Sequence, residues 1–277
     1  MPDQLNQWLP SVKQIAKKAG AAILAVYNAG GDIKVTLKED ESPVTVADKA
    51  GHDIIMAELR ALTPDIPVLS EEGVLPTFEK RSAWADYWLV DPLDGTKEFI
   101  NRNGEFTVNI ALIRDGKAIL GVVYVPVKDI MYWAAESYGA FKESSGMVTR
   151  LSVRRVPKDN IAVVASRRHG AEALEGMLAR LAARFGRIDR VSMGSSLKIC
   201  LVAEGVADWY PRLALTSEWD TAAAHAILTE AGGVIVDAEM FLPLKYNQKD
   251  SLLNPYFHVF ADQSINWKAL LTAEEFS

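Results

Sequence analysis

Apolar residues recur at helical spacing in two segments near the start of the chain. The pattern predicts an amphipathic helix over residues 12–26, which a Gly-Gly pair ends, and a second helix over residues 46–62, which a Thr-Pro pair ends. The polar residues 38–43 between them predict a loop or hairpin.

Short apolar runs typical of strands follow these helices. The first two runs, residues 66–69 and 87–90, each end directly on carboxylates. Three more runs joined by turn residues predict successive antiparallel strands, at residues 106–113, 118–125 and 130–134. The first half of the chain is therefore predicted to pack helices on an antiparallel sheet.

Strands and helices alternate in the second half of the sequence. The predicted strands are residues 161–165, 188–191, 207–210, 233–236 and 257–261. The predicted helices are residues 171–185, 195–204, 219–231 and 266–271. Such alternation indicates an α/β layer set. The chain is expected to combine an α+β half, residues 1–157, with a tightly joined α/β half, residues 158–277.

The composition narrows the class of protein. The chain has 277 residues, of which 49% are hydrophobic and 24% charged, so it can bury a large core. Its one cysteine, Cys200, excludes an intramolecular disulfide and a Cys-rich zinc site, so any metal must be held by oxygen or histidine. We expect a cytoplasmic protein, because the sequence shows neither a secretion signal nor an integral membrane segment.

The net charge of −6 does not indicate the basic surface that a nucleic acid polymer would bind. An anionic metabolite would also be mildly repelled by this charge. A phosphorylated ligand would therefore need local cations or a bound metal.

Three acidic clusters lie at the ends of predicted elements, where rigid frames display active-site groups: Glu71-Glu72, Asp91 with Asp94, and Asp220. Carboxylates and backbone carbonyls are the hard oxygen donors that Mg²⁺ prefers. The proline between Asp91 and Asp94 predicts a tight bend that can turn both aspartates and the Leu93 carbonyl toward one point. Gly95 then permits close approach of a phosphate, and Thr96 offers a hydroxyl beside it.

Each acidic cluster also has a purely structural interpretation. Asp94-Gly95 is a favoured turn pair, Glu71-Glu72 can be a solvated loop, and Asp220 can interact with a helix dipole. A different phosphatase chemistry uses an aspartate nucleophile in an Asp-x-Asp-x-Thr pattern. The spacing here is Asp-x-x-Asp-Gly-Thr, which disfavours that geometry and favours attack by a metal-bound water.

These residues resemble the signatures of the inositol monophosphatase superfamily of magnesium-dependent, lithium-sensitive phosphatases. Three separated motifs occur in the family's order, at residues 70–72, 91–96 and 219–223. Further segments resemble the branch that hydrolyses 3'(2'),5'-bisphosphate nucleotides; they are residues 93–100, 102–113, 194–198 and 210–212. The resemblance extends from the first helix to about Phe257 and implies a layered αβαβα sandwich.

The resemblance also implies a metal site. Its ligands would be Glu71, Asp91, Asp94, Asp220 and the Leu93 carbonyl, which would hold two or three Mg²⁺ ions. Thr96 paired with Glu71 would orient and deprotonate the attacking water. Asp48 would lie near that water or an additional metal, unless it is only a helix N-terminal carboxylate.

The resemblance further implies substrate contacts. They are Gly95, Thr96, Ser166, His169, Ser195, Lys198, Tyr210, Arg212 and Asp220. The amides of Gly95 and Thr96 would hold the reacting phosphate. Lys198 would bind the 5'-phosphate, beside a helix that Ser195 caps, although a solvated lysine is the commoner role.

Four further residues are nucleotide contacts that the resemblance implies. Ser166 and His169 match a nucleotide-contacting Ser-Arg-Ser-His segment, from which Arg168 departs. Tyr210 and Arg212 would border the base, with core packing as the alternative for Tyr210.

The implied activity is hydrolysis of the 3'-phosphate of adenosine 3',5'-bisphosphate to AMP, in sulfur assimilation or nucleotide recycling. One rival is an inositol or sugar monophosphatase with the same metals, and another is a non-catalytic nucleotide-binding relative. The first half would carry most metal ligands, and the second half would carry the nucleotide contacts and Asp220. A monomer or weak homodimer is expected, in the cytoplasm or peripheral to the inner membrane.

Overall fold

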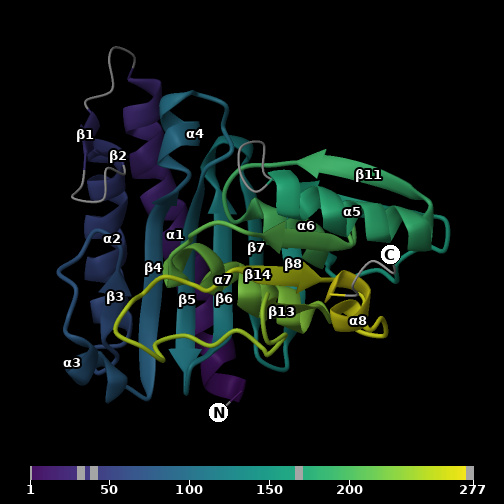
Figure 1. Cartoon of the computed structure of the whole chain (residues 1–277). Coiled ribbons are helices and arrows are strands. Elements are labelled where there is room, and N and C mark those ends of the chain that lie inside the picture. The colour runs from purple at the N-terminus through teal and green to yellow at the C-terminus, as the bar shows by residue number, and fades with distance from the viewer. Residues whose placement is uncertain (1, 30–34, 38–42, 166–170, 273–277) are drawn as a thin grey trace.

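Five alternating layers of helices and strands make up the protein (Figure 1). The structure, a computed structural model, describes residues 2–29, 35–37, 43–165 and 171–272. Two helices cover the outer face of a seven-stranded sheet, two more lie between this sheet and a five-stranded one, and the last pair covers the outer face of the smaller sheet. The predicted αβαβα sandwich is confirmed.

The outer helices of the first layer are α1 (Pro2–Asn28) and α2 (Val46–Leu62). The second helix has the predicted bounds, but α1 begins well before residue 12. The prediction stopped short because Pro10 interrupts the pattern, whereas the structure accommodates Pro10 inside the helix. Leu5 and Leu9 are buried and extend the apolar side of α1 toward its start.

The larger sheet has the strand order β3-β4-β5-β6-β7-β8-β9, in which only the β3–β4 pair is parallel. Its strands are β3 (Val68–Ser70), β4 (Asp86–Asp94), β5 (Thr107–Arg114), β6 (Lys117–Val125), β7 (Ile130–Ala135), β8 (Gly139–Ser144) and β9 (Met147–Arg150). The last two strands were not predicted, because β8 is only partly buried and β9 is exposed along its whole length, so neither shows an apolar alternation.

The smaller sheet has the strand order β11-β10-β12-β14-β13, with both parallel and antiparallel pairs. Its strands are β10 (Asn160–Ala165), β11 (Arg187–Ser192), β12 (Trp209–Arg212), β13 (Val234–Asp237) and β14 (Phe257–Phe260). The helices α6 (Leu197–Ala203) and α7 (Glu218–Glu230) fill the space between the sheets, and α5 (Ala171–Phe185) and α8 (Trp267–Thr272) cover the outer face.

Short elements complete the described part of the chain. They are β1 (Val35–Leu37), β2 (Pro43–Thr45), α3 (Phe78–Ser82), α4 (Thr96–Ile100) and the 3-10 turn η1 (Pro126–Lys128). None of the helices that the structure describes is long and apolar enough to cross a bilayer.

The central helix α7 lies very close to the larger sheet. A Cβ at Gly121 on β6 would come within 2.1 Å of the carbonyl oxygen of Ala223, so only glycine allows this approach. Buried residues of both sheets, α6 and α7 form one continuous core cluster. The division of the chain at residue 157 stays a prediction.

Candidate metal centre

Three aspartates from two distant parts of the chain meet between the sheets. Asp91 and Asp94 lie on β4, and Asp220 lies in the first turn of α7. One carboxylate oxygen from each aspartate lies within 4.8 Å of those of the other two. The structure therefore brings together three of the four carboxylates predicted to bind metal.

The segment that carries Asp91 and Asp94 differs from the predicted tight bend after a strand that ends at Val90. Strand β4 continues to Asp94, with a register shift between Asp91, which pairs with Asn109, and Asp94, which pairs with Thr107. The irregularity accommodates Pro92, which has no N–H to donate to the sheet. It keeps both aspartates on the frame of a buried strand.

Local hydrogen bonds orient this segment. The Leu93 amide donates to Oδ1 of Asp91 at 2.9 Å, and the Thr96 hydroxyl lies 3.5 Å from the Leu93 carbonyl oxygen as a donor. Gly95 has a φ of 94°, a left-handed conformation that glycine adopts without strain, and it ends the strand where α4 begins.

Two capping boxes hold the carboxylates that come from helices. The Ser217 amide donates to Oδ2 of Asp220 at 2.9 Å, at the start of α7. The amide and hydroxyl of Thr45 both donate to Oδ2 of Asp48 at 2.7 Å, at the start of α2. The other oxygen of Asp48 accepts the Thr96 hydroxyl at 3.3 Å. Asp48 is thus a helix N-terminal carboxylate and also a neighbour of Thr96.

The electrostatics of the cluster favour a bound cation. Burial, followed by the charges of Glu71, Asp94 and Asp220, raises the pKa of Asp91 well above its usual value. Burial and then Asp94 likewise raise the pKa of Asp220, and burial raises the pKa of Asp94. Buried carboxylates that repel one another fit a divalent ion with oxygen ligands, and magnesium is such an ion.

A hydroxyl and amide network, which the sequence did not predict, holds Asp94. Its Oδ2 accepts the Ser196 amide and lies 3.5 Å from the Thr107 hydroxyl. The Ser196 hydroxyl lies 2.9 Å from that of Thr107 and donates to Oδ1 of Asn109 at 2.9 Å. A signal was present, because Thr107 and Asn109 are polar residues on one face of a strand that is otherwise apolar up to Arg114.

The predicted cap at Ser195 lies one position too early, although the Ser195 hydroxyl accepts the Leu197 amide at 3.5 Å. Helix α6 begins at Leu197, so Ser196 is the residue at its start, and its hydroxyl serves the Asp94 network instead of capping the helix. Ser195 has a φ of 49° in the bend before the helix.

A cavity of about 390 Å³ opens from the metal cluster. Its lining includes Asp94, Gly95, Ser195, Lys198, Tyr210, Arg212 and Asp220, all of which the sequence singled out. It also includes Glu98, Asn101, Asn103 and Glu105, for which the sequence indicated no role. Glu105 accepts the Gly194 amide at 2.8 Å and so fixes the segment that precedes Ser195.

Lys97, Lys198 and Arg212 are the cationic side chains that line this cavity with Asp94 and Asp220. Lys198 donates to the Ser195 carbonyl at 2.9 Å, and its Nζ lies 5.8 Å from the centre of the Tyr210 ring. Burial lowers the pKa of Lys198, although the nearby Asp94 opposes the shift. Arg212 donates to the Leu215 carbonyl at 3.0 Å, while its buried Nε lacks a partner among the described residues.

Some predicted features fall outside the contacts of the described residues. Ser166 and His169 lie outside the described residues. The hydrogen bonds described for Thr96 go to Asp48 and Leu93, so its pairing with Glu71 stays a prediction. Glu71 follows β3 and lies near enough to Asp91 and Asp220 to raise the pKa of both.

The layered sandwich, the oxygen-ligand cluster and the cation-lined cavity define a class of protein that can hold a divalent metal next to an anionic small molecule. The chain belongs to the inositol monophosphatase family, whose model matches residues 4–269.

Named relatives cover nearly the whole chain. The chain is 52% identical over 253 residues to the 3'(2'),5'-bisphosphate nucleotidase CysQ of Salmonella typhimurium (strain LT2), in an alignment that spans 91% of this chain and 98% of the relative. The protein of the same name from Escherichia coli (strain K12) is 53% identical over 253 residues, which also span 91% of this chain and 98% of the relative. The crystal structure of CysQ from Bacteroides thetaiotaomicron matches with a TM-score of 0.80 at 43% identity, over 92% of this chain and 97% of that chain.

Proposed function

We propose that this protein is a magnesium-dependent phosphatase that removes the 3'-phosphate of adenosine 3',5'-bisphosphate and releases AMP. The observation that carries the proposal is a cavity whose lining combines Asp94 and Asp220 of the acidic cluster with Lys198 and Arg212. A bisphosphorylated nucleotide presents one phosphate for a metal and a second for a cation. The relatives that carry the name 3'(2'),5'-bisphosphate nucleotidase support this substrate class.

Glu71, Asp91, Asp94, Asp220 and the Leu93 carbonyl are the proposed ligands of two or three Mg²⁺ ions. Magnesium would offset the charge of the carboxylates, polarise the phosphoryl oxygens and make a water molecule more acidic. The donor set fits magnesium because all its atoms are hard oxygens.

Thr96 is proposed to orient the attacking water. Its hydroxyl has one hydrogen to donate, to Asp48 or to the Leu93 carbonyl, so its oxygen lone pairs remain to accept a hydrogen bond from water. Glu71 would take the proton of that water as a general base. The amides of Gly95 and Thr96, at the start of α4, would hold the reacting phosphate while the sugar contacts Asp220.

Lys198 and Arg212 are proposed to bind the 5'-phosphate, which is not hydrolysed. Both cations lie beside the cavity, and the buried Nε of Arg212 has an unused donor among the described residues. Tyr210 and Ser195 would form the adjoining wall of the cavity. Ser166 and His169, which lie outside the described residues, are proposed as further nucleotide contacts.

A substrate comparison tests this function. With Mg²⁺, phosphate release from adenosine 3',5'-bisphosphate should exceed that from inositol 1-phosphate, and a chelator should abolish both. Asp94→Asn should remove most of the activity, because it takes a charge from the metal cluster. Preference for inositol phosphate would support the monophosphatase alternative, and unchanged activity of Asp94→Asn would contradict the mechanism.

The 5'-phosphate subsite has its own test. Lys198→Met should raise KM for adenosine 3',5'-bisphosphate about ten- to a hundredfold, the value of a lost charge-assisted hydrogen bond. KM for adenosine 3'-monophosphate should stay near the wild-type value. Lys49→Met provides the control, because Lys49 is exposed on α2 and pairs with Asp53. Equal effects on both substrates would contradict the assignment of Lys198.

A further inference from the structure

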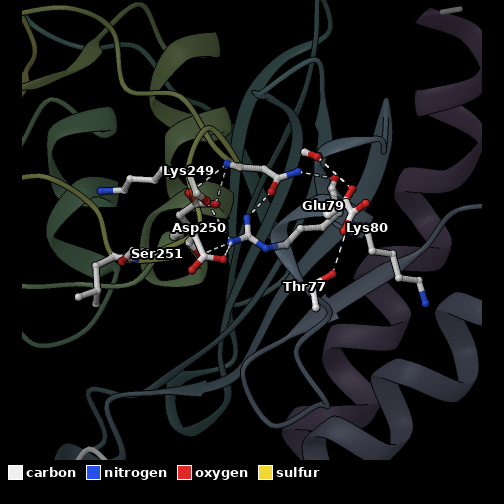
Figure 2. Close-up of polar contacts among 11 residues, drawn as sticks. Thr77, Glu79, Lys80, Lys249, Asp250 and Ser251 are labelled. Atoms are coloured by element: carbon white, nitrogen blue, oxygen red, sulfur yellow. Dashed lines mark hydrogen bonds and ion pairs between the residues drawn. The ribbon is translucent and has the colours of Figure 1, made fainter.

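A buried arginine outside the cavity joins two segments that are far apart in sequence. Arg81 lies on α3 and only 2% of it is exposed. Its guanidinium donates to Oδ1 of Asn247, to the Lys249 carbonyl at 3.0 Å and to the Asp250 carbonyl. Figure 2 shows the two segments face to face, with Lys249, Asp250 and Ser251 opposite Thr77, Glu79 and Lys80. Such a set of contacts uses the rigid fork of arginine, which lysine lacks.

Asn247 extends this contact to the start of α7. Its side-chain amide returns a hydrogen bond to the Arg81 carbonyl at 2.7 Å. Its backbone amide donates to both carboxylate oxygens of Glu218, at 3.0 and 2.9 Å. Glu218 is the first residue of α7 and is itself 2% exposed. Arg81, Asn247 and Glu218 thus form one continuous polar chain, here called the Arg81 clamp.

Further bonds from the same loop hold the first turn of α7. The Glu218 amide donates to the Leu252 carbonyl at 2.8 Å, and the Asn254 side chain donates to the Ser217 carbonyl at 2.7 Å. Ser217 in turn donates to Asp220. The loop that Arg81 anchors therefore fixes the residues that orient Asp220.

Both ends of the clamp lead to the metal cluster. Arg81 lies on the connection from β3 to β4, which begins with Glu71 and ends at the strand that carries Asp91. Glu218 lies two residues before Asp220. We propose that Arg81 and Asn247 are positioning residues that set the distance between Asp220 and the carboxylates of the other half.

The cluster needs such a restraint because its members repel one another. One carboxylate oxygen of each of Asp91, Asp94 and Asp220 lies within 4.8 Å of those of the other two, so like charges push the start of α7 away from β4 when no cation is bound. Packing of Ala223 on Gly121 fixes the middle of α7, whereas Asp220 lies in its first turn. The clamp holds that first turn and so preorganises the cluster for a metal ion.

Metal binding without substrate tests this inference. The probe is Mn²⁺, which suits carboxylate and carbonyl ligands, and free Mn²⁺ is counted by electron paramagnetic resonance. Arg81→Met should raise the Mn²⁺ dissociation constant about tenfold, the lower end of the effect of losing a group that supports a ligand. Asn247→Gly should act in the same direction, and glycine tolerates the φ of 57° at this position.

Arg114→Met is the matched control. Arg114 also forms a two-pronged ion pair, with Asp86 at the opposite end of β4 from Asp94. This variant should lose stability and keep the wild-type Mn²⁺ dissociation constant. In kinetics at varied Mg²⁺, Arg81→Met and Asn247→Gly should raise the half-saturating metal concentration and leave KM for the nucleotide at saturating metal unchanged.

The inference depends on the proposed function only in that the cluster binds a divalent metal. If the Asn247→Gly variant folds and binds Mn²⁺ with wild-type affinity, the inference is overturned. This variant alone tests the inference if Arg81→Met does not fold. Wild-type protein that binds Mn²⁺ but does not hydrolyse adenosine 3',5'-bisphosphate would instead contradict the proposed substrate and leave the clamp test intact.

Discussion

The aspartates of the metal cluster lower the stability of the metal-free fold, although the proposed function needs them. Asp91 is buried and Asp94 and Asp220 are half-buried, and the folded protein raises the pKa of each above its ordinary value. A carboxyl group with a raised pKa destabilises the fold at neutral pH, because the folded chain holds its charge less favourably than water does. A residue that lowers the stability of the metal-free fold in this way fits the proposed role as a metal ligand.

Asp220→Asn tests this opposition. The variant should raise the free energy of unfolding in a chelator by about 1 kcal/mol, because it removes one repelling charge while an amide oxygen can keep the hydrogen bond from Ser217. It should also weaken Mn²⁺ binding. Chemical denaturation with and without metal measures both effects. Asp65→Asn, at an exposed position, is the control, and a variant less stable than wild type in chelator would contradict the prediction.

His258 predicts an acid sensitivity elsewhere in the molecule. Both its ring nitrogens are buried without a partner in the described part of the chain, and burial lowers its pKa from 6.5 to about 4. Between these pH values the unfolded chain binds the proton and the folded chain does not, so stability falls as the pH drops below 6.5.

His258→Phe should remove this part of the pH dependence. Between pH 7 and pH 5, the free energy of unfolding of the variant should fall by about 2 kcal/mol less than that of the wild-type protein, as measured by urea denaturation. Burial also lowers the pKa of His225 to about 4. His225 should therefore cause the same remaining pH dependence of stability in both proteins. Parallel stability curves for the two proteins would contradict the assignment.

Residue types and spacing predicted the aspartates but not their supports. Asp91, Asp94 and Asp220 follow or begin recognisable elements, so the sequence alone singles them out. Arg81 and Asn247 are 166 positions apart and carry no local motif, so only the fold reveals their contact. The Ser196 contact with Asp94 spans 102 positions and was missed for the same reason.

At the scale of elements, the starts of α2 and α7 were predictable features of the site. The patterns Thr45-x-x-Asp48 and Ser217-x-x-Asp220 both form capping boxes, which are local and depend on side-chain reach alone. The length of β4 was less predictable, because its last residues are held by pairing with β5 despite Pro92. Long-range pairing can extend a strand through a residue that local pattern treats as its end.

The seating of α7 on the larger sheet gives a prediction at this scale. Gly121→Ala should lower the free energy of unfolding by about 1–3 kcal/mol or more and weaken Mn²⁺ binding, because the added methyl meets the Ala223 carbonyl and displaces α7. Thermal unfolding and Mn²⁺ titration measure the two effects.

Gly176→Ala is the control for that variant. Gly176 lies inside α5 with nothing within 4 Å of an added Cβ, so alanine should stabilise the helix by about 0.5–1 kcal/mol and leave metal binding unchanged. Equal Mn²⁺ affinity of the wild-type protein, Gly121→Ala and Gly176→Ala would show that the position of α7 does not determine metal binding by the cluster.

At the scale of the whole molecule, the site lies where the two sheets face each other. Asp91 and Asp94 come from the larger sheet, whereas Asp220 and Lys198 come from the helices between the sheets (Figure 1). The alternation of elements predicted the layers, but it could not predict which loops would meet, because register between layers depends on side-chain packing such as that at Gly121.

A metal held at this junction should stabilise the whole fold. At a concentration one hundred times the dissociation constant, Mg²⁺ should raise the free energy of unfolding by about 2.7 kcal/mol, and a chelator should reverse the gain. Differential scanning calorimetry measures the shift. Asp94→Asn should show a much smaller gain, and a gain equal to that of wild type would place the ion elsewhere.

The most direct test of the proposed function follows the product rather than the rate. Adenosine 3',5'-bisphosphate is incubated with the protein and Mg²⁺, and phosphorus NMR identifies which phosphate is lost. We expect AMP with its 5'-phosphate intact and one equivalent of inorganic phosphate. Adenosine 3'-monophosphate as the product, or no reaction under conditions in which inositol 1-phosphate is hydrolysed, would contradict the proposal.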